Sequence, residues 1–316
     1  SASLMKNATC RQLRVFNEVA RHLSFVRAAE ALHLTPPAVT MQIKELEGHL
    51  GMALFDRTGK KIRLTTAGEY MLLYARRILA TIKDAEDAAA RLQRAEVGIL
   101  TVGMVGTSKY FMMRMLSEFK KRHEGVDLRV VTGNREQLVV MLQANEVDIA
   151  VMGRPPRELR YRAEPFAVHP LVFVAATENR LYQRSLVEPI DAEDLRYQHF
   201  IVREHGSGTR AVMQQFFDNA RIEPSYKIQL NSNETIKQAV MADLGLGFLS
   251  LHTIGSEIKQ NEIGILNVAG TPIFRAWNLV HTQSKMLSPA AEALRYFVLE
   301  NAETTLGSMF GDIKLN

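Results

Sequence analysis

The chain has 316 residues, of which 47% are hydrophobic and 23% are charged, and its formal net charge is +5. This composition is typical of soluble globular proteins, and the length predicts two or three domains. The longest apolar stretches, such as residues 171–176 and 244–251, are far shorter than the roughly 20 residues of a membrane-spanning helix. No basic segment followed by an apolar run opens the chain, so we expect no export, no membrane partner and a cytoplasmic protein.

The single cysteine, Cys10, excludes an internal disulfide, and the nine histidines show no metal-ligand spacing. We therefore expect no metal and no cofactor.

The basic residues are concentrated near the start of the chain. Residues 1–64 contain ten Lys and Arg against five Asp and Glu, a difference of +5, so the remaining residues are neutral overall. This asymmetry indicates a polyanionic partner for the first region alone. A solvated basic surface would give the same counts, so the charge does not decide between the two interpretations.

Three helices are predicted in that region. Residues 11–21 carry apolar side chains at helical spacing. Ser24 can cap a short alanine-rich helix that ends near Leu32. Thr35 can cap a third helix, and Pro36 suits its first turn because no backbone N–H is needed there. Two helices joined by so short a turn are typical of a helix-turn-helix.

The third helix has two distinct faces at 100° per residue. Its predicted core face consists of Val39, Ile43, Leu46 and Leu50. The opposite face consists of Pro37, Met41, Lys44 and Gly48, with Thr40 beside it. Small, hydroxyl, basic and methyl-contacting side chains suit the edges of bases and the phosphates of a major groove. An ordinary amphipathic helix would also have such a polar face.

Residues 55–64 alternate apolar and basic side chains around a glycine, which predicts a small β-hairpin wing. Its basic side chains would contact phosphates or the minor groove and add affinity that depends on salt but not on sequence. These side chains are Arg57, Lys60, Lys61 and Arg63.

A long helix is predicted next, because Thr66 and Glu69 fit a capping box and no Gly or Pro follows Gly68 until Gly98. Apolar residues recur with a seven-residue period at Met71, Ala75, Ile78, Ile82, Ala85, Ala89 and Leu92. Roughly 28 residues give about 42 Å of helix, more than so small a domain can cover. We expect a second copy of the helix to cover it, with packing on the chain's own second half as the alternative. Pairing would place two recognition helices on one duplex with a pseudo-palindromic sequence.

From Leu100 short apolar strands alternate with helices, which predicts an α/β fold. Expected strands are 100–105, 128–132, 149–152, 171–175, 199–202 and 274–281. Expected helices are 110–122, 137–144, 210–221, 235–242 and 289–300.

Three places in this half suit an anionic ligand. Thr107 and Ser108 follow a strand and open a helix, although they could equally be simple caps. A stronger candidate is the glycine-rich segment that contains Glu204, Ser207, Gly208, Thr209 and Arg210, where hydroxyls and a guanidinium meet a helix start. Weaker candidates are Asn134, Arg154 and Asn233, each of which could also be a turn residue or a surface charge.

The run FVRAAEALHLTPPAVTMQIKELEGHLGMALFDRTGKKIRLTTAG, residues 25–68, resembles the DNA-binding signature of LysR-type transcriptional regulators. The resemblance implies that Thr35–Leu50 is the recognition helix, with Pro37, Thr40 and Met41 at base-contacting positions. Some family members carry arginine at the position of Met41, so a guanine contact from that position is absent here. The full set expected to contact double-stranded promoter DNA is Ser24, Thr35, Pro36, Pro37, Thr40, Met41, Lys44, Arg57, Lys60, Lys61 and Arg63.

The resemblance also implies the domain organisation: a winged helix-turn-helix over 5–65, a linker and dimerisation helix over 66–94, and an effector domain over 98–316. The effector domain would have two lobes like a periplasmic binding protein, with the chain crossing near Glu164 and Val268. Lobe I would comprise 98–165 and 271–316, and lobe II 166–270. Ligand would bind between the lobes. Dimers that assemble into tetramers are implied, and RNA polymerase is a candidate partner of an activator.

Two segments narrow the resemblance, because VMGRPP (151–156) and VREHGSGTR (202–210) resemble regulators of Calvin-cycle carbon-fixation operons. These regulators sense phosphorylated or dinucleotide metabolites, so a phosphorylated metabolite or NADPH is the expected effector. The alternative is a regulator of an unrelated operon that senses an aromatic or other carboxylate. An enzyme is not expected, because the sequence has no P-loop, zinc-protease, nucleophile-elbow or complete dinucleotide motif and offers no catalytic residue. A solute-binding protein would leave residues 11–64 unexplained.

Overall fold

The computed structural model describes residues 5–92, 98–157 and 160–315. The chain forms two compact units that divide between residues 89 and 90. Among the described residues no helix combines the length and apolar character needed to cross a membrane. Each unit is described by itself below.

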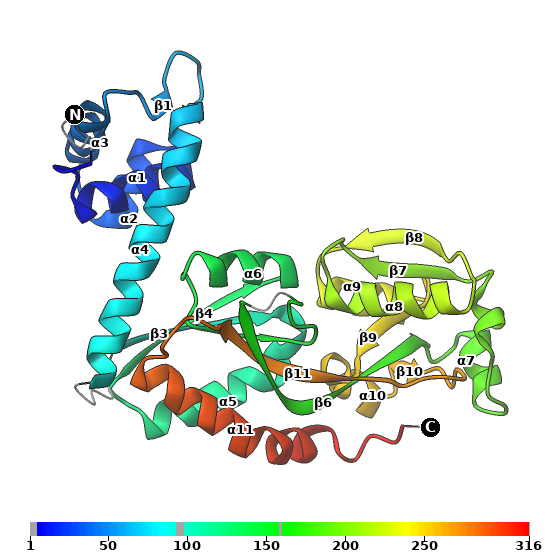
Figure 1. The fold of residues 1–316 in the computed structure, drawn as a ribbon. Coiled ribbons are helices and arrows are strands. Elements are labelled where there is room, and N and C mark those ends of the chain that lie inside the picture. Colours follow the sequence, from blue (N-terminus) through cyan, green and yellow to red (C-terminus); the bar gives the residue numbers. More distant parts are fainter. Residues whose placement is uncertain (1–4, 93–97, 158–159, 316) are drawn as a thin grey trace. The chain divides into compact units, whose positions relative to one another are not determined.

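The first unit is a helical domain with a small hairpin (Figure 1). Its elements are α1 (Cys10–His22), α2 (Phe25–Leu32), α3 (Pro36–Leu50), β1 (Phe55–Asp56), β2 (Arg63–Leu64) and α4 (Thr66–Leu92). The four residues predicted to form the core face of α3 are all buried, at 4% exposure or less. The Gln12 side chain donates a hydrogen bond to Glu45 (3.1 Å), which joins α1 to α3.

The predicted caps of the helix-turn-helix are confirmed. The Ser24 hydroxyl accepts a hydrogen bond from the Arg27 amide (3.2 Å), and the Thr35 hydroxyl accepts one from the Ala38 amide (3.4 Å). Each cap satisfies an amide that the first turn of a helix leaves free. Between them His33 adopts the left-handed conformation, with φ of 54°, which ends α2 and reverses the chain within two residues.

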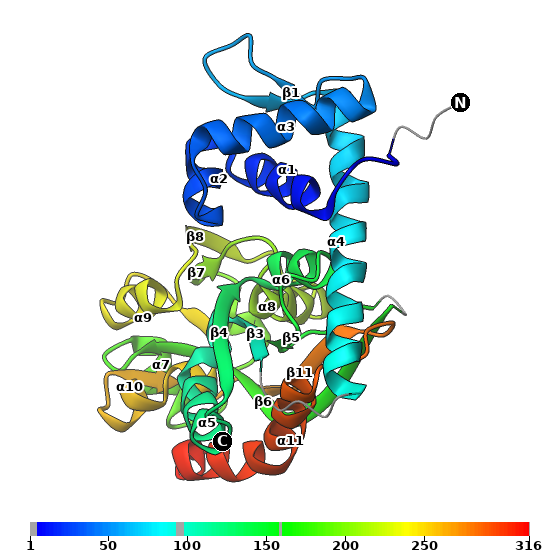
Figure 2. The same cartoon turned by 90° about the vertical axis from the view of Figure 1, so that its left-hand side faces the viewer.

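The predicted wing is also present, as an antiparallel pair in which Phe55 lies opposite Leu64 and Asp56 opposite Arg63. Figure 2 shows this hairpin beside α3. The Asp56 carboxylate accepts hydrogen bonds from the amide (2.9 Å) and hydroxyl (2.7 Å) of Thr58, which starts the turn. These bonds lower the pKa of Asp56. Phe55 anchors the base of the wing, since its ring packs edge-on against Phe16.

The cap of α4 lies one residue earlier than predicted. The Thr65 hydroxyl, not that of Thr66, accepts the hydrogen bond from the Gly68 amide (2.9 Å). A Cβ at Gly68 would lie 2.1 Å from the Leu54 carbonyl oxygen. The helix can therefore start here only because glycine lets its first turn approach the segment before the wing.

The buried and exposed faces of α4 also differ from the seven-residue pattern that was expected to pair with a second copy of the helix. Leu72 and Ala75 are buried in the core of the first unit, and Met71 and Leu79 pack against that core. The seven-residue pattern therefore serves partly to attach α4 to its own domain. Another apolar stripe remains exposed and shares only Ile78 with the predicted pattern. It consists of Tyr70, Leu73, Tyr74 and Ile78, with exposed fractions of 67, 52, 51 and 37%.

The second unit is built on one curved mixed sheet of seven strands in the order β10-β6-β11-β5-β3-β4, with β9 also paired to β6. Its strands are β3 (Gly98–Val105), β4 (Val126–Gly133), β5 (Ile149–Met152), β6 (Tyr161–Ala176), β9 (Gly247–Ser250), β10 (Ile263–Ile265) and β11 (Ile273–Thr282). β3, β4 and β5 are parallel, whereas β6 and β11 are antiparallel. A separate parallel pair is formed by β7 (His199–Arg203) and β8 (Ser225–Leu230).

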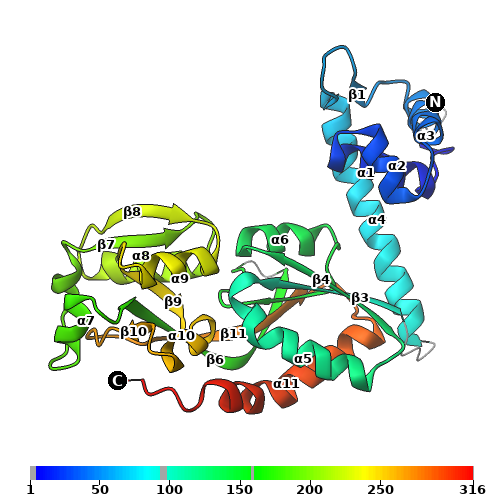
Figure 3. The same ribbon diagram turned by 180° about the vertical axis from the view of Figure 1, so that it is seen from behind.

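Two lobes lie at opposite ends of this sheet (Figures 1 and 3). In lobe I, α6 covers one face, while α5 and α11 cover the other. In lobe II, α8 and α9 pack on β7, β8 and β9. The helices are α5 (Lys109–Arg122), α6 (Arg135–Gln143), α7 (Arg180–Ser185), α8 (Gly208–Asn219), α9 (Asn233–Met241), α10 (Gly255–Lys259) and α11 (Pro289–Phe310), with the short 3₁₀ turns η1 (Gly106–Ser108), η2 (Ala192–Leu195) and η3 (Leu251–Thr253).

Both connections between the lobes are strands, and they pair with each other. β6 is 16 residues long, whereas the sequence predicted only its second half. Its first half pairs with β11, and its second half pairs with β9 and β10. The predicted first crossing near Glu164 lies within β6, but the chain returns along β11, which begins at Ile273 rather than near Val268.

Candidate DNA interface and effector cleft

The recognition helix presents the side chains that the sequence predicted. Pro36, Pro37, Met41 and Lys44 are exposed, and Thr40 is half-buried. Together with Glu45 they line a shallow hollow on the surface of the domain. Met41 is 52% exposed although it is apolar, so its thioether is free to contact a partner. Ser24 and Thr35 lie at the helix starts, where their hydroxyls are engaged as caps.

The wing residues fall into two groups. Lys60, Lys61 and Arg63 are exposed around the turn. Arg57 is exposed too, but its guanidinium donates to Glu47 (3.1 Å) and lies 4.7 Å from the centre of the Phe25 ring. Arg57 therefore also holds the wing against α2 and α3, which the charge pattern alone did not indicate.

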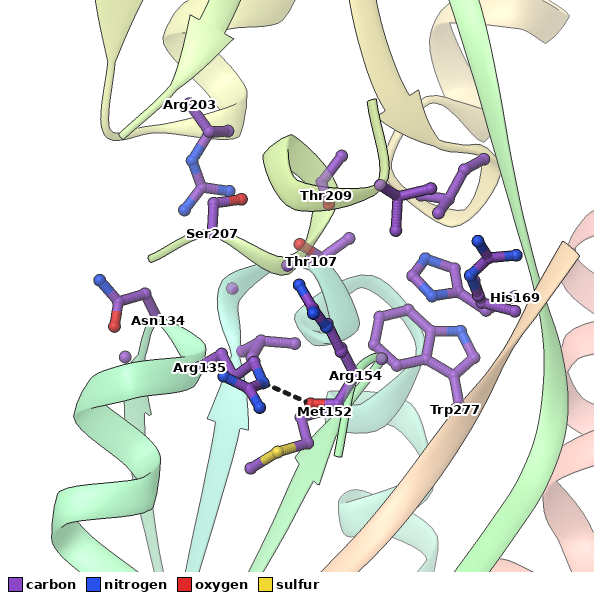
Figure 4. Close-up of a pocket in the computed structure, with 18 residues that line it drawn as sticks. Thr107, Asn134, Arg135, Met152, Arg154, His169, Arg203, Ser207, Thr209 and Trp277 are labelled. Atoms are coloured by element: carbon purple, nitrogen blue, oxygen red, sulfur yellow. Dashed lines mark hydrogen bonds between the residues drawn. The ribbon is translucent and has the colours of Figure 1, made fainter. Parts of the chain in front are cut away.

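The second unit has a cleft between its lobes, at the carboxyl ends of β3, β4 and β5 (Figure 4). Lobe I contributes the starts of η1 and α6 and the end of β5. Lobe II contributes the loop after β7 and the start of α8, and the two crossing strands form the floor. The lining residues are Val105, Gly106, Thr107, Gly133, Asn134, Arg135, Met152, Gly153, Arg154, His169, Leu171, Arg203, Ser207, Gly208, Thr209, Val212, Arg275 and Trp277.

Two helices begin at the cleft, one from each lobe. Asn134 caps α6 by accepting a hydrogen bond from the Gln137 amide (2.9 Å). Ser207 caps α8 by accepting one from the Arg210 amide (3.4 Å). Helix starts carry partial positive charge and free amides, so both suit an anion.

The glycine-rich loop brings the lobes close together. Gly206 has φ of 87°, and a Cβ there would lie 2.9 Å from a carboxylate oxygen of Glu136, which belongs to α6 in lobe I. A residue with a side chain would be strained at this φ, and the Glu136 carboxylate would have to move to make room for its Cβ. The prediction that this loop belongs to a site is consistent with that position.

Four arginines line the cleft: Arg135, Arg154, Arg203 and Arg275. No Asp or Glu is found among the described residues that line it. Arg135 donates to the carbonyl oxygens of Arg154 (2.9 Å) and Pro155 (3.3 Å), the first of which is drawn in Figure 4. No hydrogen bond of the Arg154 guanidinium is found within the described part of the chain, and Figure 4 shows its side chain extending between the lobes. Arg203 is paired with the Glu204 carboxylate, so Arg154 and Arg275 supply the positive charge that favours an anionic ligand.

Arg203 is held in place by two residues that the sequence had assigned to the ligand. The Glu204 carboxylate accepts two hydrogen bonds from its guanidinium (2.8 and 2.9 Å), and the Asn233 side-chain oxygen accepts a third (2.8 Å). Glu204 and Asn233 do not line the cleft themselves. They hold the guanidinium of Arg203, which does.

Of the ten predicted effector residues, six line the cleft: Thr107, Asn134, Arg154, Ser207, Gly208 and Thr209. Ser108 does not, because its hydroxyl donates to the Val105 carbonyl (2.9 Å). Arg210 is directed elsewhere as well. Its guanidinium donates to the Arg203 carbonyl (2.8 Å) and to Gln229 (2.7 Å), and it lies over the Tyr226 ring.

The sequence did not single out the residues on the crossing strands. His169 and Trp277 stack with ring centres 3.8 Å apart, and the Trp277 indole N–H donates to His252 Nδ1 (2.9 Å). Burial lowers the pKa of His252 to about 4, so its imidazole is neutral and free to accept that bond. Neighbours in space from strands 100 residues apart leave no local pattern, so sequence reasoning had no means of grouping them.

Comparison with known proteins identifies the family. A model described as "Bacterial regulatory helix-turn-helix protein, lysR family" matches residues 10–69, and one described as "LysR substrate binding domain" matches residues 93–303. The regulator CfxR of Cupriavidus necator is 49% identical over 312 residues, which are 99% of this chain and 98% of that protein. A RuBisCO operon transcriptional regulator of Allochromatium vinosum is 42% identical over 94% of this chain and 97% of its own length.

A solved structure agrees. The regulatory domain of Synechocystis PCC6803 CcmR, in complex with 2-PG, superposes with a TM-score of 0.61 and 33% identity, covering 64% of this chain and 96% of that one. A helix-turn-helix followed by a two-lobed domain with a cleft defines a DNA-binding protein that also binds a small molecule. The chain belongs to the LysR family of transcriptional regulators and is not an enzyme. The predicted fold class is confirmed.

Proposed function

We propose that this chain regulates a carbon-fixation operon and that a small phosphorylated anion in the effector cleft modulates its binding to promoter DNA. The observation that carries the proposal is the cleft itself, where four arginines and two helix starts converge and where no Asp or Glu is found among the described lining residues. The names of CfxR and of the RuBisCO operon regulator support the target, and 2-PG in the CcmR structure supports the ligand class.

The size of the cleft favours a small ligand. Its cavity volume is about 40 Å³, enough for only a few water molecules. A phosphorylated two-carbon or three-carbon acid would require less separation of the lobes than NADPH, which we rank second. The aromatic-carboxylate alternative ranks below it, because several guanidiniums and two helix starts suit a phosphate group better than a single carboxylate.

For DNA binding we propose that Pro37, Thr40 and Met41 contact base edges and that Lys44 contacts a phosphate. The exposed wing residues Lys60, Lys61 and Arg63 would add phosphate contacts. These assignments rest on the exposure of the side chains around the buried core face of α3. We also propose that the protein acts in the cytoplasm, where a bacterial regulator would meet its promoter DNA.

We further propose that the stripe formed by Tyr70, Leu73, Tyr74 and Ile78 pairs with the same stripe of a second chain. Four large side chains on one face of a helix are a strong signal for association. A dimer of this kind predicts a pseudo-palindromic DNA site, and pairs of dimers would give the expected tetramer.

Heat-induced unfolding of the full chain with a panel of ligands tests the effector. The panel contains 2-phosphoglycolate, phosphoenolpyruvate, a phosphosugar, NADPH and an aromatic carboxylate. A ligand that binds the folded state raises the midpoint by mass action. We expect phosphorylated acids to raise it, Arg154→Ala to abolish the effect, and Arg180→Ala, at an exposed position outside the cleft, to preserve it. Stabilisation by the aromatic carboxylate alone would refute the proposed effector class.

A further inference from the structure

His169 lies on β6 where the two crossing strands join the lobes. It is opposite Arg275 in the register of β6 and β11. Its side chain is 4% exposed, yet it lines the effector cleft. Both ring nitrogens are buried without a hydrogen-bond partner in the described part of the chain. A buried polar group without a partner is rare and costly in folded proteins, so a functional explanation is required.

The surroundings fix the imidazole in its position. Its ring stacks on Trp277 at an interplanar angle of 18°, and the bond from Trp277 to His252 fixes the indole in turn. A Cβ at Gly153 would lie 2.8 Å from His169 Nδ1. Gly153 lines the same cleft, and only a residue without a side chain can approach this edge of the imidazole so closely. Figure 4 shows the ring of His169 above that of Trp277, on the floor between the lobes.

The charges around His169 indicate its protonation state. Arg275 on β11 and Arg154 at the end of β5 line the same cleft, and His252 in η3 stacks at 6.1 Å. Burial, assisted by His252, lowers the pKa of His169 well below its usual value. The neutral ring offers one N–H donor and one acceptor nitrogen, and neither is used within the described chain.

We propose that His169 is a direct ligand of the effector, donating its free ring N–H to an oxygen of the bound anion. This inference rests on the proposed function, since it assigns a contact to the same phosphorylated effector. A phosphate or carboxylate oxygen is the acceptor that an arginine-lined cleft would bring to this position, and Arg275 lies opposite His169 in the sheet. His169 thereby favours ligands that place an oxygen atom beside its ring at the floor of the cleft.

The test compares the affinity of the full chain for 2-phosphoglycolate with the stability of the unliganded protein. His169→Phe keeps an aromatic ring that can stack on Trp277 but removes both nitrogens. We expect calorimetric titration to show a loss of affinity of about tenfold or more, the scale of a hydrogen bond to a charged group. The unliganded thermal midpoint should stay level or rise, because an unsatisfied buried polar group has been removed. His169→Gln, which retains an N–H donor, should recover part of the affinity.

His281→Phe is the matched control, because His281 is buried in the same sheet but does not line the cleft. It should bind 2-phosphoglycolate as the wild type does. If His169→Phe binds within twofold of wild type, or if it loses affinity and stability together, His169 is a structural residue and the inference is overturned. If His169→Gln binds 2-phosphoglycolate no more tightly than His169→Phe does, a direct hydrogen bond from His169 is also contradicted. If the wild type binds neither 2-phosphoglycolate nor any other phosphorylated acid, the proposed function and this inference both fail.

Discussion

The Tyr110 hydroxyl donates a hydrogen bond to the Glu234 carboxylate, and this bond joins α5 of lobe I to α9 of lobe II. Lys237, which is 3% exposed, lies 3.2 Å from the same carboxylate. Tyr110 follows the cleft loop Gly106–Ser108 by two residues, and Glu234 follows Asn233, which holds Arg203. The two residues of this inter-lobe contact are therefore adjacent in sequence to residues that line the cleft or support its lining.

We predict that Tyr110→Phe weakens the binding of 2-phosphoglycolate by about two- to tenfold, the usual net value of one hydrogen bond. The variant removes a bond between the lobes without altering a residue that lines the cleft, so ligand binding must supply more of the energy that holds the lobes in this arrangement. Calorimetric titration measures the change. Tyr226→Phe is the matched control, because the Tyr226 hydroxyl bonds to Gln214 within lobe II. Equal losses in the two variants would contradict a role for the inter-lobe bond.

A second prediction concerns acid stability and the bond between β6 and α11. Arg295 donates to both carboxylate oxygens of Glu164 (2.6 and 2.7 Å). The side-chain hydrogen bond from Arg295 lowers the pKa of Glu164, although partial burial opposes this. A carboxyl whose folded-state pKa is lowered stabilises the fold above its unfolded-state pKa, and that contribution disappears as the pH falls through the folded-state value.

Arg295→Gln should therefore destabilise the protein by about 1–3 kcal/mol at pH 7. The difference from wild type should shrink as the pH falls from the unfolded-state pKa of a glutamate, about 4.3, through the lowered folded-state pKa of Glu164, and should disappear once Glu164 is protonated in both proteins. Urea titrations at a series of pH values give the two free energies of unfolding. A difference that stays constant from pH 7 to pH 3 would be incompatible with the paired carboxylate.

The part of the molecule that sequence reasoning predicted best is the part governed by local rules. Caps at Ser24 and Thr35 and the 3.6-residue spacing of the α3 core residues each act within one or two turns. The α4 cap was misplaced by one residue, since the choice between Thr65 and Thr66 depends on how closely Gly68 approaches Leu54. That approach is a tertiary contact, which no local pattern encodes.

The effector cleft shows the same limit more clearly. Helix starts at Asn134 and Ser207 could be found because glycines and capping residues mark them. Arg210 and Arg203 were not distinguishable, because the direction of each guanidinium depends on Gln229 and Asn233, which lie on later elements. Only residues 171–175 of β6 were predicted, because the preceding part of the strand mixes charged and apolar residues around two prolines.

A third prediction concerns the exposed stripe of α4. Leu73→Lys should convert the full chain from a dimer, or a larger assembly, to smaller species, because a charge would be buried in an apolar helix pair. Glu86→Lys places the same side chain at an exposed position of the same helix that points away from the stripe at 100° per residue, and it should leave the assembly intact. Analytical ultracentrifugation at several concentrations distinguishes the species. If the wild type is itself monomeric, or if both variants dissociate alike, the stripe is not the pairing surface.

The last prediction separates base contacts from phosphate contacts on α3. Lys44→Ala should weaken binding to a selected duplex and to a random duplex by the same factor, because a phosphate contact carries no sequence information. It should also reduce the slope of log affinity against log salt by about 0.9, the value for one neutralised phosphate. Met41→Ala removes no charge, so its salt slope should match the wild type while its preference for the selected duplex falls. Lys227→Ala, which removes an exposed charge from the effector domain, should change neither quantity. Fluorescence anisotropy over a range of salt concentrations measures all three variants, and a changed slope for Met41→Ala or an unchanged slope for Lys44→Ala would reverse the two assignments.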